Sequence, residues 1–243
     1  MLPLKDINKS LTTPHINRLI IIANIIIFTL FWLSSQNILL NQKLARDMWD
    51  PEYNTGMFLM VPSEIIQGQR LFTLFTSMFM HAGWLHLLGN MLFLYVFGDN
   101  IEDAFGHAGY LVFYIISGLA AALAHIVSIF FAPFIGDLTG TFIDSGWTAG
   151  VVGASGAISG VLGAYIVLYP KTKIISLVFY FILPVPAIIF LGFWFIMQWV
   201  YGFFDISGEV AYWAHIGGFI AGMILASVFG LKRKKAREAH LRL

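Results

Sequence analysis

The sequence contains no cysteine. This absence excludes disulfide bonds and thiolate chemistry and leaves the cellular compartment open. Charged residues are also scarce, since Asp, Glu, Lys and Arg make up 11% of the 243 residues, against about 25% in an ordinary soluble domain. The first 15 residues lack an apolar core with a small-residue cleavage site, so we expect no removable signal peptide. The shortage of charge argues against a soluble globular fold.

Long apolar runs take the place of the missing charge. Hydrophobic residues make up 58% of the chain, and the mean hydropathy is +0.80. Several runs approach or exceed the roughly 18 to 20 residues that cross a bilayer as a helix. They are too long and continuous for barrel strands, and a spanning segment must satisfy its own backbone hydrogen bonds. The sequence therefore predicts an all-α, multi-pass membrane protein without β-strands.

The apolar runs divide the chain into three predicted parts. Residues 1–18 form an N-terminal segment, residues 19–231 a six-helix domain with a long first loop at 36–70, and residues 232–243 a basic tail. Residues 71–80 are predicted to be an interfacial segment before the second span. In the fifth span, Pro184 and Pro186 are expected to kink the helix. The six predicted spans are Leu19–Ser35, Gly83–Ile101, Gly109–Phe131, Val151–Tyr169, Ile174–Val200 and Ala211–Leu231.

The distribution of positive charge predicts the orientation. With a cytoplasmic N-terminus, three basic residues, Lys43, Arg46 and Arg70, would lie outside, and the other eleven of the 14 would lie inside. Cytoplasmic segments carry an excess of Lys and Arg, so both termini are predicted to be cytoplasmic. The basic tail could suggest nucleic acid or anionic lipid as a partner, but we interpret it as a positive-inside anchor and expect no nucleic-acid partner. In a prokaryote this would place the protein in the cell membrane.

Several strongly polar residues lie inside the predicted spans. Ser155 and His215 are each the fifth residue of a span, and the two spans run in the same direction, so both would lie about 6 to 7 Å below the outer ends of their helices. His86 and Asn90 are four residues apart and share one face of the second span. Such residues are costly in lipid and are functional candidates by default: His86, Asn90, His125, Ser155, Ser159 and His215.

This set of side chains permits acyl transfer. A serine hydroxyl can act as the nucleophile and an imidazole as its base, while amide or imidazole donors can face an oxyanion. Small residues would let the helices approach closely enough for Ser155 to reach His215. They are Gly153, Gly156, Gly160 and Gly163 in the fourth span and Gly217, Gly218 and Gly222 in the sixth.

Each of these signals has a structural alternative. A glycine-rich stretch around a serine is, alone, more often a packing face than a nucleophile motif, and a single intramembrane histidine is more often a packing or relay group. For His125 and Ser159 we favour the packing interpretation. No H-E-x-x-H motif is present, and the five-residue spacing of His81 and His86 suits two ligands on one helix face poorly. We therefore expect no metal and no small-molecule cofactor.

Three separated blocks of sequence resemble the rhomboid family of intramembrane serine proteases. The first is HAGWLHLLGN, residues 81–90, followed by Gly98 and Glu102. The second is GASGAISGVLGAY, residues 153–165, and the third is AHIGG, residues 214–218, continuing to Gly222. Their order and their placement on the second, fourth and sixth spans also match. The resemblance covers most of the chain from residue 70 to residue 231 and implies a six-helix rhomboid-like bundle.

The resemblance also implies roles for individual residues. Ser155 corresponds to the nucleophile and His215 to the general base of a dyad without a carboxylate partner. His86 and Asn90 correspond to the oxyanion hole, together with the Ser155 N–H. The family's structural glycines correspond to Gly153, Gly156, Gly218 and Gly222.

The chain departs from the family pattern at two positions. Arg70 resembles the arginine of a Trp-Arg pair, but Gln69 takes the place of the tryptophan. Ser159 stands where some members carry an aromatic residue that stacks on the histidine, which leaves open what orients His215.

The predicted function is that of an intramembrane serine endopeptidase. Its implied partners are the lipid bilayer and transmembrane protein substrates, with lateral access past the fifth helix and the loop at 201–210. One alternative is a catalytically silent rhomboid-like protein that binds membrane helices, although this sequence keeps both Ser155 and His215. The other is a proton-coupled transporter that uses His86, His125 and His215 as a relay, which would leave the glycines around Ser155 unexplained.

Overall fold

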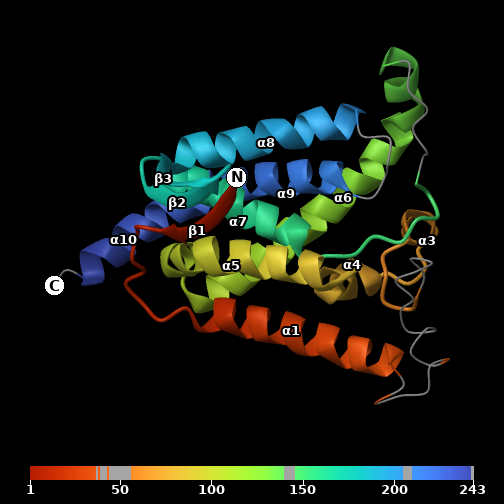
Figure 1. The fold of residues 1–243 in the computed structure, drawn as a ribbon, viewed down its shortest axis with the longest axis horizontal. Helices are drawn as coiled ribbons and strands as arrows, with labels where there is room; N and C mark the ends of the chain where they lie inside the picture. The colour runs from red at the N-terminus through yellow and green to blue at the C-terminus, as the bar shows by residue number, and fades with distance from the viewer. Residues whose placement is uncertain (37, 39–42, 44–55, 140–145, 205–209, 242–243) are drawn as a thin grey trace.

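Long helices form the body of the protein in a computed structural model, which describes all residues except 37, 39–42, 44–55, 140–145, 205–209 and 242–243. The long helices are α1 (His15–Ser35), α5 (Trp84–Phe105), α6 (His107–Thr139), α7 (Ser155–Leu168), α8 (Ala187–Phe204) and α9 (Tyr212–Leu225). Helices α1, α5, α8 and α9 run roughly along the horizontal axis of Figure 1, and α6 crosses the view obliquely. A π-helical segment, η2 (Ala226–Gly230), joins α9 to α10 (Leu231–Leu241). The remaining short helices are α3 (Pro62–Ile66), α4 (Thr73–Thr76) and η1 (Ser77–Phe79).

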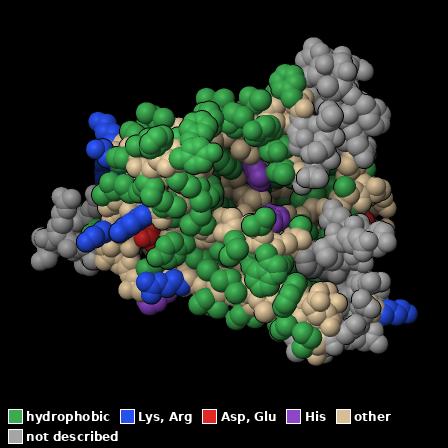
Figure 2. All heavy atoms as spheres, viewed as in Figure 1, with side chains coloured by type: hydrophobic (Ala, Val, Ile, Leu, Met, Phe, Trp, Pro, Cys, Tyr) green, Lys and Arg blue, Asp and Glu red, His purple; other side chains and the backbone are tan. Residues whose placement is uncertain are grey.

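Four of the described helical segments are long and apolar enough to cross a membrane. They are His15–Ser35, His107–Phe131, Ala187–Phe204 and Tyr212–Ala236, while α7 is apolar but has only 14 residues. Hydrophobic side chains cover much of the face in Figure 2, and many large apolar residues of α1, α6 and α8 are exposed. An exposed apolar surface of this extent is suited to lipid rather than to water. Residues 37, 39–42 and 44–55 of the predicted first loop, and residues 205–209 of the predicted loop 201–210, lie outside the described residues.

Helix α7 lies inside the bundle, where it packs against α5, α6 and α9. Its contact with α9 is a backbone contact. A Cβ added to Gly218 would lie 2.1 Å from the Gly156 carbonyl oxygen, and one added to Gly222 would lie 1.9 Å from that of Gly160. Only residues without side chains fit at such a distance. This contact holds the first turns of α7 and α9 close together.

A small antiparallel sheet corrects the prediction of an all-α fold. Its order is β1-β2-β3, formed by β1 (Leu2–Asp6), β2 (Lys173–Val178) and β3 (Phe181–Pro186). The predicted fifth span therefore begins with a β-hairpin, and only α8 is helical. The N-terminal segment is part of the fold, because β1 pairs with β2. We call the end of the bundle that carries the sheet and α10 the sheet end (Figure 1).

The hairpin forms where a helix was predicted because an apolar run without clear periodicity suits either structure. Phe179, in the turn, has a left-handed φ of 53° and ends β2. Pro184 and Pro186 lie on β3, an edge strand, where a residue without an N–H is tolerated. They do not kink a helix, as the sequence had suggested; they stand just before α8 begins at Ala187.

The start of α7 is a second correction. The fourth span was predicted to begin at Val151, but residues 151–154 are not helical and Ser155 is the first residue of α7. Gly153 has a φ of 123°, a conformation that side-chain-bearing residues rarely adopt and that interrupts a helix. Ser155 and His215 are thus the first and fourth residues of their helices rather than the fifth of each.

Buried polar side chains are bonded to one another at the sheet end. The Glu102 carboxylate is fully buried and accepts hydrogen bonds from the backbone N–H groups of Ile16 and Asn17, in the first turn of α1. The Glu102 carboxylate also contacts Nδ1 of the His107 imidazole. A carboxylate at this place satisfies N–H groups that have no partner within their own helix. Glu102 therefore ties α5 to the start of α1.

The N-terminal strand is held by a similar contact. The Asp6 carboxylate accepts hydrogen bonds of 2.7 Å from both Asn100 Nδ2 and Tyr165 Oη. Burial is the main reason that the pKa of Asp6 is raised to about 6, and repulsion from Asp99 acts in the same direction against these hydrogen bonds. β1 is therefore attached to α5 and α7 by a carboxylate whose charge depends on pH near neutrality.

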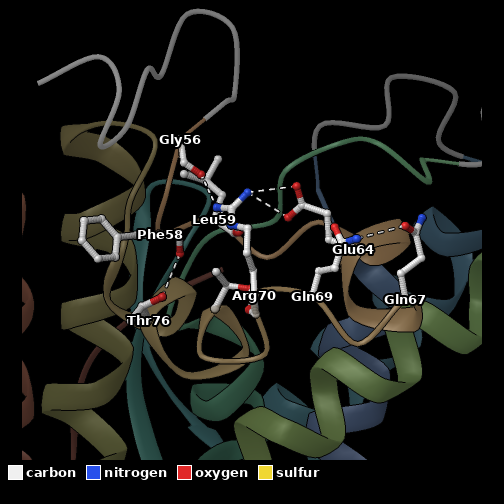
Figure 3. Close-up of polar contacts among 9 residues, drawn as sticks. Gly56, Phe58, Leu59, Glu64, Gln67, Gln69, Arg70 and Thr76 are labelled. Carbon is white, nitrogen blue, oxygen red and sulfur yellow. Dashed lines mark hydrogen bonds and ion pairs between the residues drawn. The ribbon is translucent and has the colours of Figure 1, made fainter. Parts of the chain in front are cut away.

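The described part of the first loop is cross-linked around Arg70 (Figure 3). Its guanidinium contacts Glu64 at 2.8 Å and donates to the Gly56 carbonyl at 2.6 Å. The same loop reaches the segment before α7 through a two-way backbone pairing of Met60 with Val151. Arg70 thus stabilises the loop that supports the approach to Ser155.

Candidate active site

Ser155 and His215 are brought together at the end of the bundle away from the sheet. The Ser155 hydroxyl lies 2.8 Å from His215 Nε2, a hydrogen-bond distance. The two side chains come from the first turns of α7 and α9, which the glycine contact holds together. A hydroxyl bonded to an imidazole in this way is the arrangement of an activated nucleophile and its base.

His86 borders the same point. A Cβ added to Gly153 would lie 2.9 Å from His86 Nε2 and 3.5 Å from the Ser155 hydroxyl, so Gly153 leaves room between them. His86 Nδ1 accepts a hydrogen bond from the Ala82 N–H at 3.4 Å. In a neutral imidazole the other nitrogen then carries the proton. His86 can therefore present an Nε2–H donor beside Ser155.

Asn90 lies one turn further along α5. It is 8% exposed, and its Nδ2 has no hydrogen-bond partner among the described residues. An amide donor is rarely buried without a partner, because the loss of its bond to water is not compensated. One cavity of about 1020 Å³ is lined by Asn90, His86, Ser155 and His215. Figure 2 shows histidine side chains within a hollow on this face.

The other polar residues singled out in the sequence lie nearby. Ser159 donates its hydroxyl to the Ser155 carbonyl at 2.6 Å, as a packing serine does. His125 lines the cavity from α6, and its Nδ1 is buried without a partner among the described residues. His81 is fully buried and packs edge-on against His86 with ring centroids 5.2 Å apart. Among the described residues, no group of three or more His, Asp or Glu side chains could hold a metal ion.

One polar neighbour of His215 was missed in the sequence. Gln198 Oε1 of α8 lies 2.9 Å from His215 Nδ1, and the Trp194 ring lies 5.9 Å from the imidazole between centroids. A lone glutamine in an apolar helix was the available signal. The fifth span was predicted to start at Ile174 and to be kinked by its prolines, so nothing indicated which of its residues would face His215.

These contacts describe a site suited to acyl transfer. The first N–H groups of α7 have no partner within the helix and mark the positive end of its dipole, which lies at Ser155. Donors from α5 and the start of α7 therefore line the same cavity as the hydroxyl that is bonded to His215. An oxyanion formed next to Ser155 would have several donors within the same cavity.

Comparison with known proteins gives a family match. The Rhomboid domain model matches residues 68–232. "RHOMBOID-like protein 6, mitochondrial" of Arabidopsis thaliana is 30% identical over 72% of this chain and 49% of its own length. "Rhomboid protease GluP" of Bacillus subtilis is 31% identical over 72% of this chain and 29% of its own. "Rhomboid protease AarA" of Providencia stuartii is 30% identical over 68% of this chain and 58% of its own.

The matched regions make up a larger share of this chain than of its relatives' chains. The chain spans about half the length, or less, of most of the curated relatives described above. The matched family domain nevertheless includes α5 to α9 and every residue of the candidate site. The chain therefore belongs to the rhomboid family of multi-pass integral membrane proteins, which includes serine intramembrane proteases.

Proposed function

We propose that this protein is an intramembrane serine endopeptidase in which Ser155 is the nucleophile and His215 its general base. The observation that carries the proposal is the 2.8 Å contact between the Ser155 hydroxyl and His215 Nε2 inside a cavity that His86 and Asn90 also line. Relatives named as rhomboid proteases support it. The substrates would be transmembrane proteins, cleaved in or near their membrane helices.

The reaction follows from the positions of these groups. Ser155 Oγ attacks the carbonyl carbon of the scissile peptide bond while His215 Nε2 takes the hydroxyl proton. The tetrahedral oxyanion accepts hydrogen bonds from His86 Nε2–H, Asn90 Nδ2–H and the N–H groups at the start of α7. His215 then gives the proton to the leaving amine, and an acyl-enzyme remains. Water, activated by His215, attacks that ester and frees Ser155.

The proposed topology has six spans with both termini in the cytoplasm. The spans are α1, α5, α6, α7, α8 and α9 with η2. Basic residues gather at the sheet end, where Arg233 donates to the Phe105 carbonyl at 3.0 Å and Lys234 to the Leu168 carbonyl at 2.7 Å. Positive side chains there favour the cytoplasmic side of a membrane. The dyad then lies in the opposite leaflet, open to water through its cavity.

Serine-reactive labelling tests the proposal most directly. The purified, detergent-solubilised protein is treated with a fluorophosphonate probe and, in parallel, with a model transmembrane substrate. We expect Ser155→Ala and His215→Ala to lose both labelling and cleavage by at least about 1000-fold. Ser159→Ala is the matched control, since its hydroxyl lies one turn away and bonds only the Ser155 carbonyl among the contacts observed.

The outcomes separate the candidate functions. Labelling and cleavage that persist in Ser155→Ala would overturn the proposal. A folded wild type that neither labels nor cleaves would favour a silent protein that binds membrane helices. Proton flux that depends on His215 but not on Ser155 would favour a transporter.

A further inference from the structure

Gln198 is placed to orient His215. Where a third residue accepts a hydrogen bond from the base of a catalytic serine, it fixes the tautomer and the ring orientation of that base. Here the acceptor next to His215 Nδ1 is Gln198 Oε1, at 2.9 Å. The opposite ring nitrogen, Nε2, faces the Ser155 hydroxyl at 2.8 Å. Gln198, His215 and Ser155 thus form one hydrogen-bonded series across α8, α9 and α7.

The orientation of the Gln198 amide follows from its second contact. Gln198 Nε2 donates to the Trp194 carbonyl, one turn earlier in α8, at 3.1 Å. With its NH₂ group used in this way, the amide presents its oxygen to His215. An oxygen acceptor requires a proton on Nδ1, which leaves Nε2 as the acceptor in the neutral ring. This is the tautomer that can take the Ser155 proton.

The surroundings of Gln198 indicate a specific role for its amide. Gln198 is 6% exposed, and the other buried residues of α8 are Ala187, Phe190 and Leu191. Burying an amide among apolar groups is costly unless both of its ends are hydrogen-bonded, as they are here. A hydrocarbon side chain at this position would avoid that cost. The amide is therefore best explained by what it bonds.

The described lining of the cavity holds no carboxylate that could accept a hydrogen bond from His215. Among its described lining residues the titratable side chains are His86, His125, Tyr201, Tyr212 and His215, and none is a carboxylate. A neutral amide can orient the imidazole without adding charge to the site. The aromatic rings of Trp194 and Tyr212 flank the imidazole at 5.9 and 6.2 Å between centroids and limit its rotation.

We propose that Gln198 is a positioning residue for the dyad, holding His215 in the Nδ1–H tautomer with Nε2 aimed at Ser155. This inference rests on the proposed protease function for its kinetic consequence, but its structural part concerns the imidazole alone. The residue that orients His215 of α9 toward Ser155 of α7 therefore lies on a third helix, α8. Helix α8 thereby takes part in organising the site as well as in facing lipid.

The experiment compares Gln198→Leu and Gln198→Glu with wild type. Gln198→Leu keeps the size of the side chain and removes the acceptor, whereas Gln198→Glu keeps an acceptor in the same place. Ile196→Leu, on the exposed side of the same helix, is the control for substitution in α8. We measure kcat, KM and the pH profile for a model transmembrane substrate, the thermal midpoint, and the imidazole tautomer by ¹⁵N NMR of histidine-labelled protein.

In Gln198→Leu we expect kcat to fall about 10-fold to 100-fold, because a misplaced reacting group costs on that order, with KM and the thermal midpoint nearly unchanged. The NMR signature of His215 should change from Nδ1–H to a mixture of tautomers. Gln198→Glu should recover most of kcat and move the acid limb of the profile to higher pH, because a carboxylate favours the protonated imidazole. Ile196→Leu should match wild type in every measurement.

Two results would overturn the inference. One is a folded Gln198→Leu protein with wild-type kcat and an unchanged His215 tautomer. The other, which decides the matter if Gln198→Leu does not fold, is a Gln198→Glu protein with an unchanged acid limb. Failure of the proposed function itself would appear differently, as cleavage that persists without Ser155, and the NMR result would then still report whether Gln198 fixes the tautomer.

Discussion

The two ends of the helix bundle treat buried polar groups in opposite ways. At the sheet end, the side chains of Asp6, Asn17 and Glu102 are buried and bonded to partners on other elements. Around the cavity, Asn90 Nδ2 and His125 Nδ1 are buried without partners among the described residues. The first pattern adds stability, because each buried group is compensated, whereas the second lowers it.

This difference in hydrogen bonding indicates a structural role for the sheet end and a functional role for the cavity. The hydrogen bonds at the sheet end hold one arrangement of α1, α5, α7 and β1, and they use the side chains of Asp6, Asn17 and Glu102. Donors without partners that line a cavity cost stability and are available to a reacting group. We therefore expect substitutions at the sheet end to change stability and substitutions at the cavity to change turnover. Three predictions test this division, from the largest expected effect to the smallest.

Asn90→Ala is expected to reduce turnover strongly and stability little. Removing one oxyanion donor typically lowers the rate by about 100-fold to 1000-fold, while the amide donor that is lost has no hydrogen-bond partner among the described residues. Cleavage kinetics and the thermal midpoint are measured on the same preparation. The matched control is Asn24→Ala, which removes a buried asparagine of α1 that bonds the Ile20 carbonyl and does not line the cavity. Normal turnover in Asn90→Ala would remove Asn90 from the proposed site.

Glu102→Ala is expected to do the reverse. The substitution leaves the Ile16 and Asn17 N–H groups without their acceptor at the start of α1. Buried groups left without partners should lower the free energy of unfolding by about 2 to 4 kcal/mol. Unfolding in mixed micelles measures this loss, with Glu102→Gln as the control that keeps one acceptor oxygen. A protein of normal stability that has lost its activity would contradict the division between the two ends.

Asp6 gives the smallest effect and a defined pH dependence. Its pKa is about 6 in the folded protein against 3.8 in the reference state, so the folded protein binds this proton more tightly. The stability from that proton is fully present below about pH 4 and is lost as the pH rises through about 6, a change on the order of 1 to 3 kcal/mol. In Asp6→Asn this part of the stability-versus-pH curve should vanish, with turnover unchanged. Unfolding curves measured from pH 4 to pH 7 for both proteins test it, and parallel curves would show that Asp6 is not the group responsible.

The candidate site was more predictable from the sequence than the fold around it. Polar residues stand out in apolar runs, so the sequence alone was enough to select Ser155, His215, His86 and Asn90. The structure places all four around one cavity. The argument from equal depth was partly wrong, since α7 begins at Ser155 and not four residues earlier. The selection did not depend on that detail, because serine and histidine both lie within the first turns of neighbouring helices.

The hairpin and Gln198 could not be predicted, for a common physical reason. The run from Ile174 to Val200 is apolar apart from Ser176 and Gln198, so it shows no period that distinguishes a strand from a helix or one helix face from another. β2 pairs with its neighbour β3 and also with β1, about 170 residues away in the chain, and this second pairing is not visible in the local sequence. Whether Gln198 matters depends on how α8 packs against α9.

Composition and local motifs by themselves determined the membrane class, the family resemblance and the candidate nucleophile and base, because each is carried by residues close together in the chain. Only the tertiary structure decided that β1 completes a sheet, that a left-handed Gly153 starts α7 at Ser155, and that Gln198 faces His215. These features depend on contacts between segments far apart in the chain, and such contacts form only when the helices pack.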